Sequence, residues 1–248
     1  MPEHTLRICA LYPDLMNIYA DRGNLLLLER RCGWRGIGFE VTPAGLGEAI
    51  DADAHDLFYL GGGQDRDQLL CAQDLVETKR DALHAAAAAG KVILGVCGGY
   101  QLLGHAYAFA AEEVPGVGLV DLRTVRIDTT PPTPRLIGNV AIEVELPGTD
   151  GPRVLAGFEN HGGRTHLGAG EQPLGRVLRG HGNTGESGFE GVIRDGVIGT
   201  YLHGPLLPKN AWFADWLVQR ALGLDALEPL DDALELSAHA AARRAAGV

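Results

Sequence analysis

Positive charge is scarce in this sequence, and so are long apolar runs. Of its 248 residues, 21 are Lys or Arg and 32 are Asp or Glu, so the formal net charge is -11 at pH 7. This balance argues against nucleic-acid binding, which needs a basic footprint. No apolar run approaches the ~20 residues of a membrane-spanning helix, and no basic start followed by an apolar segment marks a signal peptide. We therefore expect no transmembrane segment and a cytoplasmic location.

Cysteines are also few, and they are far apart. The four are Cys9, Cys32, Cys71 and Cys97, and none belongs to a C-x-x-C pair. This spacing argues against a zinc ribbon or a redox pair, so we predict no metal site and reduced thiols. The sequence also lacks G-x-x-x-x-G-K-[ST], the phosphate-binding loop of many ATP-dependent enzymes. We therefore expect no cofactor in this chain.

Strand-like and helix-like segments alternate through the N-terminal part. Strands are predicted at 6–11, 38–42, 56–60 and 92–96, and helices at 24–31, 67–89 and from 98 to about 110. This order predicts an α/β fold whose parallel sheet is covered by helices on both faces. Short strand-like runs between about 119 and 199 predict a mostly antiparallel extension of the same sheet. A strand at 197–202, a helix at 211–222 and a helical tail from 225 complete one predicted domain, 1–248.

The segment around Cys97 carries the strongest chemical signal. The apolar run 92–96 leads to Cys97, then to Gly98 and Gly99 and a helix-like pattern. A sharp strand-to-helix turn imposes unusual backbone angles that glycine tolerates, and a helix N-terminus favours the thiolate. We therefore predict that Cys97 is a nucleophile. The other three cysteines are expected to be ordinary core residues.

Three loops that follow predicted parallel strands carry further candidate residues, at 61–65, 97–99 and 202–205. Ligands of open α/β sheets bind outside these strand ends. A thiol nucleophile needs a base, and His203 is suited to that role because it follows a strand directly. It also needs N–H donors for an oxyanion, and Gly62, Gly63 and Gly98 are the candidates.

Motifs across the chain resemble those of a known family. The pattern Gly95-x-Cys97-x-Gly99-x-Gln101 is similar to the G-x-C-x-G-x-Q signature of class I glutamine amidotransferases, which have a three-layer α/β fold. The segments 157–164 and 199–205 resemble the cobyric-acid-synthase-like branch. The combination of segments 17–24, 61–66, 158–165 and 207–210 resembles still more closely the glutaminase subunits of lipid II isoglutaminyl synthases. The resemblance covers about residues 6–222.

The resemblance implies that the chain hydrolyses L-glutamine to glutamate and ammonia through a thioester on Cys97. His203 would be the base and acid, and Arg135 would bind the α-carboxylate of glutamine, which a guanidinium recognises through two parallel hydrogen bonds. Gln101, Asn160 and His161 lie in matching motifs and are further candidates for substrate binding.

The resemblance also implies a heterodimer with a MurT-like Mur-ligase subunit. That partner would bind ATP and magnesium and would use the ammonia to amidate the D-glutamate α-carboxylate of lipid II, giving D-isoglutamine in peptidoglycan synthesis. The present chain would then meet lipid II only through its partner. Its location would be cytoplasmic, with peripheral association at the inner face of the membrane through the complex.

One departure from the wider family concerns the histidine. Most class I amidotransferases have glutamate two residues after it, whereas this chain has Pro205. The cobyric-acid-like branch also lacks this glutamate, so Glu159 or a backbone carbonyl are the hypotheses for what orients His203. The alternative functions are a glutaminase subunit of a cobyric or cobyrinic acid synthase, and a non-catalytic regulatory subunit on this fold. Gly98 disfavours an intracellular-protease-like hydrolase, which has histidine directly after the cysteine.

Overall fold

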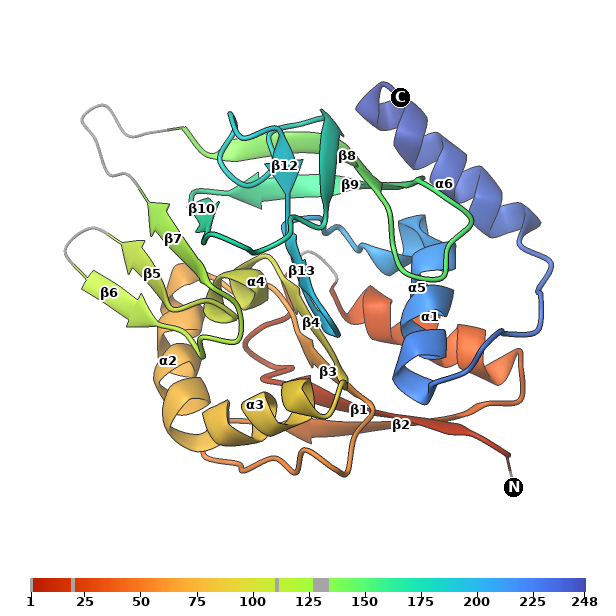
Figure 1. The fold of residues 1–248 in the computed structure, drawn as a ribbon, viewed down its shortest axis with the longest axis horizontal. Helices are drawn as coiled ribbons and strands as arrows, with labels where there is room; N and C mark the ends of the chain where they lie inside the picture. Colours follow the sequence, from red (N-terminus) through yellow and green to blue (C-terminus); the bar gives the residue numbers. More distant parts are fainter. Residues whose placement is uncertain (1, 19–20, 110–111, 127–133) are drawn as a thin grey trace.

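A six-stranded sheet forms the centre of the computed structural model, which describes residues 2–18, 21–109, 112–126 and 134–248 (Figure 1). Its strand order is β13-β14-β4-β3-β1-β2. The strands are β1 (Thr5–Leu11), β2 (Gly38–Ala44), β3 (Leu57–Leu60), β4 (Val92–Val96), β13 (Val192–Arg194) and β14 (Val197–Thr200). All neighbours are parallel except the pair β13–β14. The predicted parallel α/β sheet is therefore confirmed, with β13 as its antiparallel edge.

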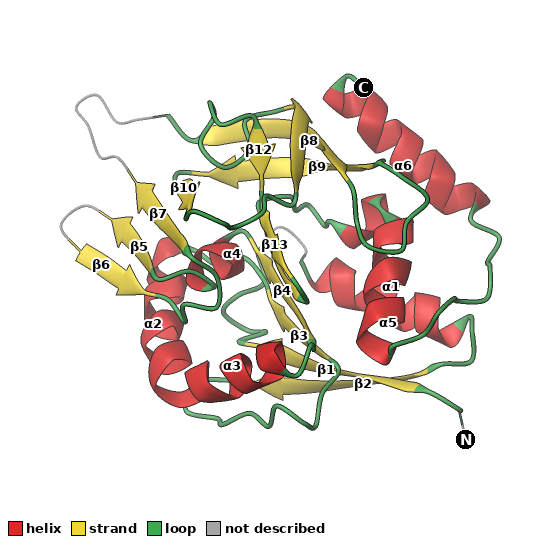
Figure 2. Ribbon diagram, viewed as in Figure 1, coloured by secondary structure: helices red, strands yellow, loops and turns green. Residues whose placement is uncertain are grey.

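Helices cover both faces of this sheet, as Figure 2 shows. Helices α1 (Arg22–Gly33) and α5 (Ala211–Leu222) pack together on one face. The other face carries α2 (Asp65–Asp74), a π-helical turn η1 (Leu75–Lys79) and α3 (Arg80–Ala88), which together form the predicted long helix. Strands β3, β4 and β14 are completely buried between these layers, which explains their continuous apolar sequences.

The middle of the chain forms two further four-stranded sheets, ordered β10-β7-β5-β6 and β12-β11-β8-β9. The first contains β5 (Ala106–Phe109), β6 (Glu112–Pro115), β7 (Leu122–Arg126) and β10 (Arg164–Leu167). The second contains β8 (Leu136–Val144), β9 (Arg153–His161), β11 (Gly175–Arg179) and β12 (Phe189–Glu190). The prediction of mostly antiparallel strands is confirmed, but the prediction that they extend the central sheet is wrong for all except β13.

The helix predicted from 98 to about 110 is also shorter than expected. Helix α4 (Gly98–Leu102) has five residues, and the chain then turns into β5. Gly104 lies at this turn, where an added Cβ would be 2.1 Å from Leu122 Cδ1. Close packing against the chain near β7 therefore ends the helix, and that contact is not visible in the local sequence pattern.

The helical tail predicted from 225 begins later, as α6 (Ala233–Ala246), and residues 225–232 before it are not helical. The tail follows α5 and the short 3-10 turn η2 (Leu207–Lys209). A buried ion cluster attaches the tail to α1 and α5. Arg31 is 0% exposed and donates hydrogen bonds to Asp215 (2.8 Å) and Asp232 (3.0 Å), and Arg35 donates to Asp215 as well. None of the described helices is long and apolar enough to cross a membrane.

Candidate active site

Cys97 occupies the sharp turn that the sequence predicted. It follows β4 directly and has φ 53° and ψ -106°, a backbone conformation that residues with a side chain rarely adopt. Its N–H donates to the carbonyl of Thr200 at 2.8 Å, so the turn is fixed to the end of β14. The strained conformation at the end of a buried strand is typical of a nucleophile held for reaction.

The thiol of Cys97 is nevertheless protonated in the chain alone. Burial, with the negative charge of Asp21, raises its pKa to about 12, although the N–H of Gly98 and the guanidinium of Arg135 act in the opposite direction. Only 7% of the residue is exposed. The N–H of Gly98 at the start of α4 does favour the thiolate, but desolvation by burial is the larger effect on the pKa.

The other three cysteines, Cys9, Cys32 and Cys71, are free thiols that are 0% exposed, as predicted for core residues. Burial raises the pKa of each to about 12. Exposure and protonation therefore do not distinguish Cys97 from these three thiols. Cys97 differs from them in its strained turn and in its place among the loops at the strand ends, outside which the other three lie.

His203 lies at the same edge of the sheet, just beyond β14, the strand that pairs with β4. Its backbone N–H and carbonyl form a bridge with Phe158, and its ring meets the Phe158 ring edge-on at 6.0 Å. Burial, together with the positive charges of His161, Lys209 and Arg135, lowers its pKa to about 4. The imidazole is therefore neutral near pH 7 and can accept a proton.

The three predicted oxyanion donors differ in what they contact. The N–H of Gly62 already donates to Asp21 Oδ2 at 2.8 Å, so it is committed elsewhere. Gly63 lies beside Gly98, since a Cβ added to Gly98 would be 3.1 Å from the Gly63 nitrogen. The Gly98 N–H faces the Cys97 sulfur. The geometry therefore favours Gly63 and Gly98 as the donor pair.

Arg135 lies at the entrance to this site. It lines a pocket of about 550 Å³ whose other lining residues are Ile18, Gly63, Gln64, Asp65 and Arg66. Its Nε donates to Asn160 Oδ1 and its Nη2 to the Asn160 carbonyl, both at 2.8 Å. Because its charge acts on both Cys97 and His203, a carboxylate bound to it would lie close to the reacting groups.

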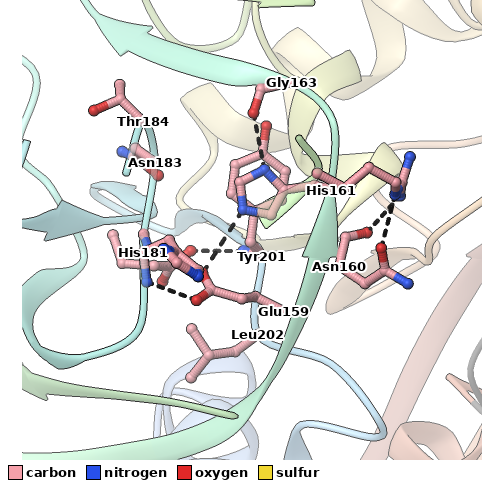
Figure 3. A network of polar contacts seen from close by, with 12 residues as sticks. Glu159, Asn160, His161, Gly163, His181, Asn183, Thr184, Tyr201 and Leu202 are labelled. Atoms are coloured by element: carbon pink, nitrogen blue, oxygen red, sulfur yellow. Dashed lines mark hydrogen bonds and ion pairs between the residues drawn. The ribbon is translucent and has the colours of Figure 1, made fainter. Parts of the chain in front are cut away.

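The remaining predicted substrate-binding residues, Gln101 and His161, belong to a buried layer below the site. Gln101 accepts a hydrogen bond from Gln68 (2.8 Å) and donates to the Tyr201 hydroxyl (3.1 Å). The ring of His161 stacks on Tyr201 at 3.5 Å, as Figure 3 shows. Both side chains support the walls of the site in this conformation.

Glu159 is part of the same layer. Its carboxylate accepts hydrogen bonds from the backbone N–H groups of His181 (2.6 Å) and Gly182 (2.9 Å), and it lies 3.7 Å from His161 Nε2 (Figure 3). The two backbone hydrogen bonds fix the Glu159 carboxylate beside the His161 ring. The hypothesis that Glu159 orients His203 stays a prediction.

Sequence reasoning missed three side chains that shape the site, namely Asp21, Gln68 and Tyr201. Asp21 belongs to the motif 17–24 but had no assigned role, and a carboxylate directly before a helix is normally a cap. Tyr19 of the same motif lies outside the described residues. Among the described residues, no group of three or more His, Cys, Asp or Glu side chains could hold a metal ion.

Comparisons with known proteins agree with this geometry. The CobB/CobQ-like glutamine amidotransferase domain matches residues 7–211. Subunit GatD of the lipid II isoglutaminyl synthase (glutamine-hydrolyzing) of Staphylococcus aureus (strain N315) is 39% identical over 219 residues, which are 88% of this chain and 85% of that protein. The corresponding Streptococcus pneumoniae (strain ATCC BAA-255 / R6) subunit is 37% identical over 220 residues, 88% and 81%.

More distant relatives share part of the chain or only the fold. The cobyric acid synthase of Pelotomaculum thermopropionicum (strain DSM 13744 / JCM 10971 / SI) is 36% identical over 135 residues, 50% of this chain and 25% of that protein. The structure of PurLQS from Thermotoga maritima superposes with a TM-score of 0.57 at 21% identity, over 80% of this chain and 87% of that one. The resemblance to the cobyric-acid-synthase-like branch is thus confirmed, and this chain belongs to the CobB/CobQ-like glutamine amidotransferase family.

Proposed function

We propose that this chain is a glutaminase subunit that hydrolyses L-glutamine to glutamate and ammonia. The observation that carries the proposal is the strained turn at Cys97, hydrogen-bonded to the end of the strand that leads to His203. The match to a glutamine amidotransferase domain supports the same reaction.

The proposed mechanism begins with Arg135 binding the α-carboxylate of glutamine. His203 takes the proton from Cys97 as the sulfur attacks the side-chain amide carbon, and the N–H groups of Gly63 and Gly98 stabilise the oxyanion that forms. The C–N bond then breaks, and the imidazolium gives its proton to the departing ammonia. A water molecule, deprotonated by His203, attacks the thioester and releases glutamate and the free thiol.

The protonation states make this reaction difficult for the resting chain. With the pKa of Cys97 at about 12 and that of His203 at about 4, the neutral thiol–imidazole pair is strongly favoured over the ion pair. Proton transfer therefore has to accompany attack, or binding has to change the surroundings of the thiol. On this basis the isolated subunit is expected to be a poor glutaminase and to gain activity in its complex.

The proposed destination of the ammonia is a MurT-like Mur-ligase partner. That subunit would bind ATP and magnesium, activate the D-glutamate α-carboxylate of lipid II and accept the ammonia to form D-isoglutamine. Two similar subunits named for lipid II isoglutaminyl synthase support this assignment, because the alignments cover more than four-fifths of each. A cytoplasmic complex at the inner membrane face follows from the same proposal.

The second candidate is the glutaminase part of a cobyric acid synthase. The matches to those enzymes span about half of this chain and roughly a quarter of their length. A non-catalytic subunit is the third candidate, and the intact Cys97 turn and the neutral His203 argue against it.

The test is to co-purify the chain with the Mur-ligase-like partner and to measure two products separately. We expect ammonia release from glutamine and, with ATP and lipid II, an amidated lipid II detectable by mass spectrometry. Cys97→Ala should abolish both when glutamine is the donor, whereas Cys32→Ala, which removes a buried thiol outside the site, should keep them. Absence of ammonia release from the wild-type pair would exclude the glutaminase; ammonia release without lipid II amidation would exclude only the lipid II pathway.

A further inference from the structure

The glycine loop at the end of β3 is anchored to the segment that precedes α1. A Cβ on Gly61 would be 2.3 Å from the Met16 carbonyl, and one on Gly63 would be 2.3 Å from Met16 Sδ. The Gly61 position therefore has no room for a side chain, because the close atom belongs to the backbone, whereas a side chain at Gly63 would displace the end of the Met16 side chain. The loop packs against Met16, Ile18 and Asp21 beside Cys97. The Cβ of Cys97 is 3.3 Å from the position that a Gly62 Cβ would take.

Hydrogen bonds fix two successive peptide groups of this loop. In the first, the Gly61 carbonyl accepts from Gly99 N–H (3.1 Å) and the Gly62 N–H donates to Asp21 Oδ2 (2.8 Å). In the second, the Gly62 carbonyl accepts from Ile18 N–H (3.1 Å). Because the N–H and C=O of a trans peptide point in opposite directions, this last bond turns the Gly63 N–H away from Ile18.

Burying the carboxyl group of Asp21 at this position costs folding free energy. It is 0% exposed, and among the described residues its Oδ1 has no hydrogen-bond partner. Burial raises its pKa to about 7, although the Gly62 N–H opposes that shift. A buried carboxyl with one unsatisfied oxygen costs stability. Nothing in the proposed reaction involves Asp21 directly, so its contact with Gly62 is the feature that needs an explanation.

We propose that Asp21 is a positioning residue for the oxyanion hole: by holding the Gly62 N–H, it keeps the following Gly63 N–H aimed at the substrate carbonyl beside the Gly98 N–H. The inference rests on the proposed glutaminase function. A run of three glycines is conformationally free. Without Asp21, the peptide before Gly62 would keep only the bond from Gly99 N–H, and the peptide after it only the bond from Ile18 N–H, so the loop would be held less firmly. The carboxyl therefore acts through the backbone and does not touch the substrate.

The charge of Asp21 is separable from its role as a hydrogen-bond acceptor. Two titratable groups on neighbouring elements respond to that charge, Tyr59 on β3 and Cys97 after β4, and it raises the pKa of both. For the thiol this is unfavourable to catalysis. An asparagine would keep an oxygen for the Gly62 N–H and remove the charge, so Asp21→Asn and Asp21→Ala have different expected effects.

The experiment measures steady-state ammonia release by the co-purified complex. Asp21→Ala should lower kcat about 10- to 100-fold and change the KM for glutamine less than about 3-fold, because a misplaced oxyanion donor weakens transition-state binding. Asp21→Asn should keep kcat within about 5-fold of wild type and should move the pH dependence of Cys97 alkylation to lower pH. Asp14→Ala, an exposed aspartate on the same segment, is the matched control and should resemble wild type.

Wild-type kcat in Asp21→Ala would overturn the proposal, and so would an Asp21→Asn variant as slow as Asp21→Ala. Thermal unfolding checks that each variant folds. If Asp21→Ala does not fold, Asp21→Glu takes its place in the comparison, because its extra methylene displaces the carboxylate from Gly62. A kcat of Asp21→Glu below that of Asp21→Asn supports the proposal. Equal kcat values for these two variants overturn it. Failure of the underlying function is distinguishable, because then the wild-type complex itself releases no ammonia.

Discussion

The thiol of Cys97 should be unusually slow to alkylate in the isolated chain. Thiolate is the reactive form, and the ordinary cysteine pKa is about 8.5. At pH 7.5 a free thiol is therefore about 10% ionised, whereas a thiol with a pKa of about 12 is ionised to roughly 3 in 10⁵. The ratio of these fractions is about 3000, so iodoacetamide should label Cys97 on the order of 10³-fold more slowly than glutathione.

The assay is a time course of iodoacetamide labelling, with the labelled peptide identified by mass spectrometry. The logarithm of the rate should rise by about one for each pH unit from 7 to 10, because a group far below its pKa gains thiolate in proportion to hydroxide. In urea, all four cysteines should react at the rate of a free thiol. The Cys97→Ala chain identifies the contribution of the other three thiols.

Two results would refute this reasoning. The first is a labelling rate at pH 7.5 that equals that of glutathione, and the second is a rate that levels off below pH 8. Either would mean that the short helix α4 and Arg135 outweigh burial. If binding of the partner accelerates labelling at constant pH, the complex activates the thiol by changing its surroundings.

Three further predictions concern the site and its support. Arg135→Lys should raise the KM for glutamine about 10- to 100-fold with a smaller change in kcat, because lysine cannot make both bonds to Asn160 and a two-pronged contact with carboxylate. Gly61→Ala should lower kcat at least about 10-fold and cost roughly 1–3 kcal/mol, since its Cβ would be 2.3 Å from the Met16 carbonyl. Arg31→Ala should lower the free energy of unfolding by about 3 kcal/mol, because it leaves the partly buried Asp232 without its hydrogen-bonded cation and leaves Asp215 with Arg35 alone.

Each of these has a matched control. Arg176→Lys alters an exposed arginine on β11 and should leave the KM unchanged. Gly138→Ala adds a methyl group where nothing lies within 4 Å, so kcat should stay at the wild-type value. Arg7→Ala removes a half-exposed arginine and should change urea unfolding by less than about 1 kcal/mol. If a control variant changes as much as its test variant, the specific explanation fails.

Alkaline pH should also destabilise the fold. The four buried thiols have folded-state pKa values of about 12, above their unfolded value of about 8.5, so the folded chain holds these protons more tightly. Their contribution is complete below pH 8.5 and is lost as the pH rises towards 12. The free energy of unfolding should fall through this window, and replacing Cys9, Cys32 and Cys71 together with alanine should flatten the fall. An unchanged slope would contradict the assignment.

Local sequence was sufficient for the features that local physics determines. Buried parallel strands are continuous apolar runs, so β4 was predictable. The glycines after Cys97 indicate a turn with an unusual backbone conformation, so the Cys97 turn was predictable as well. The early end of α4 was not, because it depends on Leu122 packing against Gly104. The same holds for the separate middle sheets, whose pairing joins distant segments.

Electrostatics at the site depended still more on tertiary structure. The sequence places Cys97 at a helix N-terminus but says nothing of how much solvent the thiol loses or that Asp21 lies nearby. The commitment of the Gly62 N–H to Asp21 was equally invisible, because it joins a loop to a residue some forty positions earlier. The tertiary structure, and not the sequence motif, therefore determines which backbone N–H groups are available to an oxyanion and which protonation state the Cys97 thiol has.

The place of β14 in the sheet has a consequence for biosynthesis. This strand lies beside β4, and Cys97 is fixed to it through Thr200, although most of the middle region separates the two in the chain. A ribosome that has made everything up to β13 has produced Cys97, the proposed nucleophile, without His203, the proposed base, and without the strand end that holds the Cys97 turn. Since chains emerge at about 5–20 residues per second, a nascent chain spends several seconds in that state. Under the proposed mechanism, the order of the strands would prevent an unfinished chain from releasing ammonia.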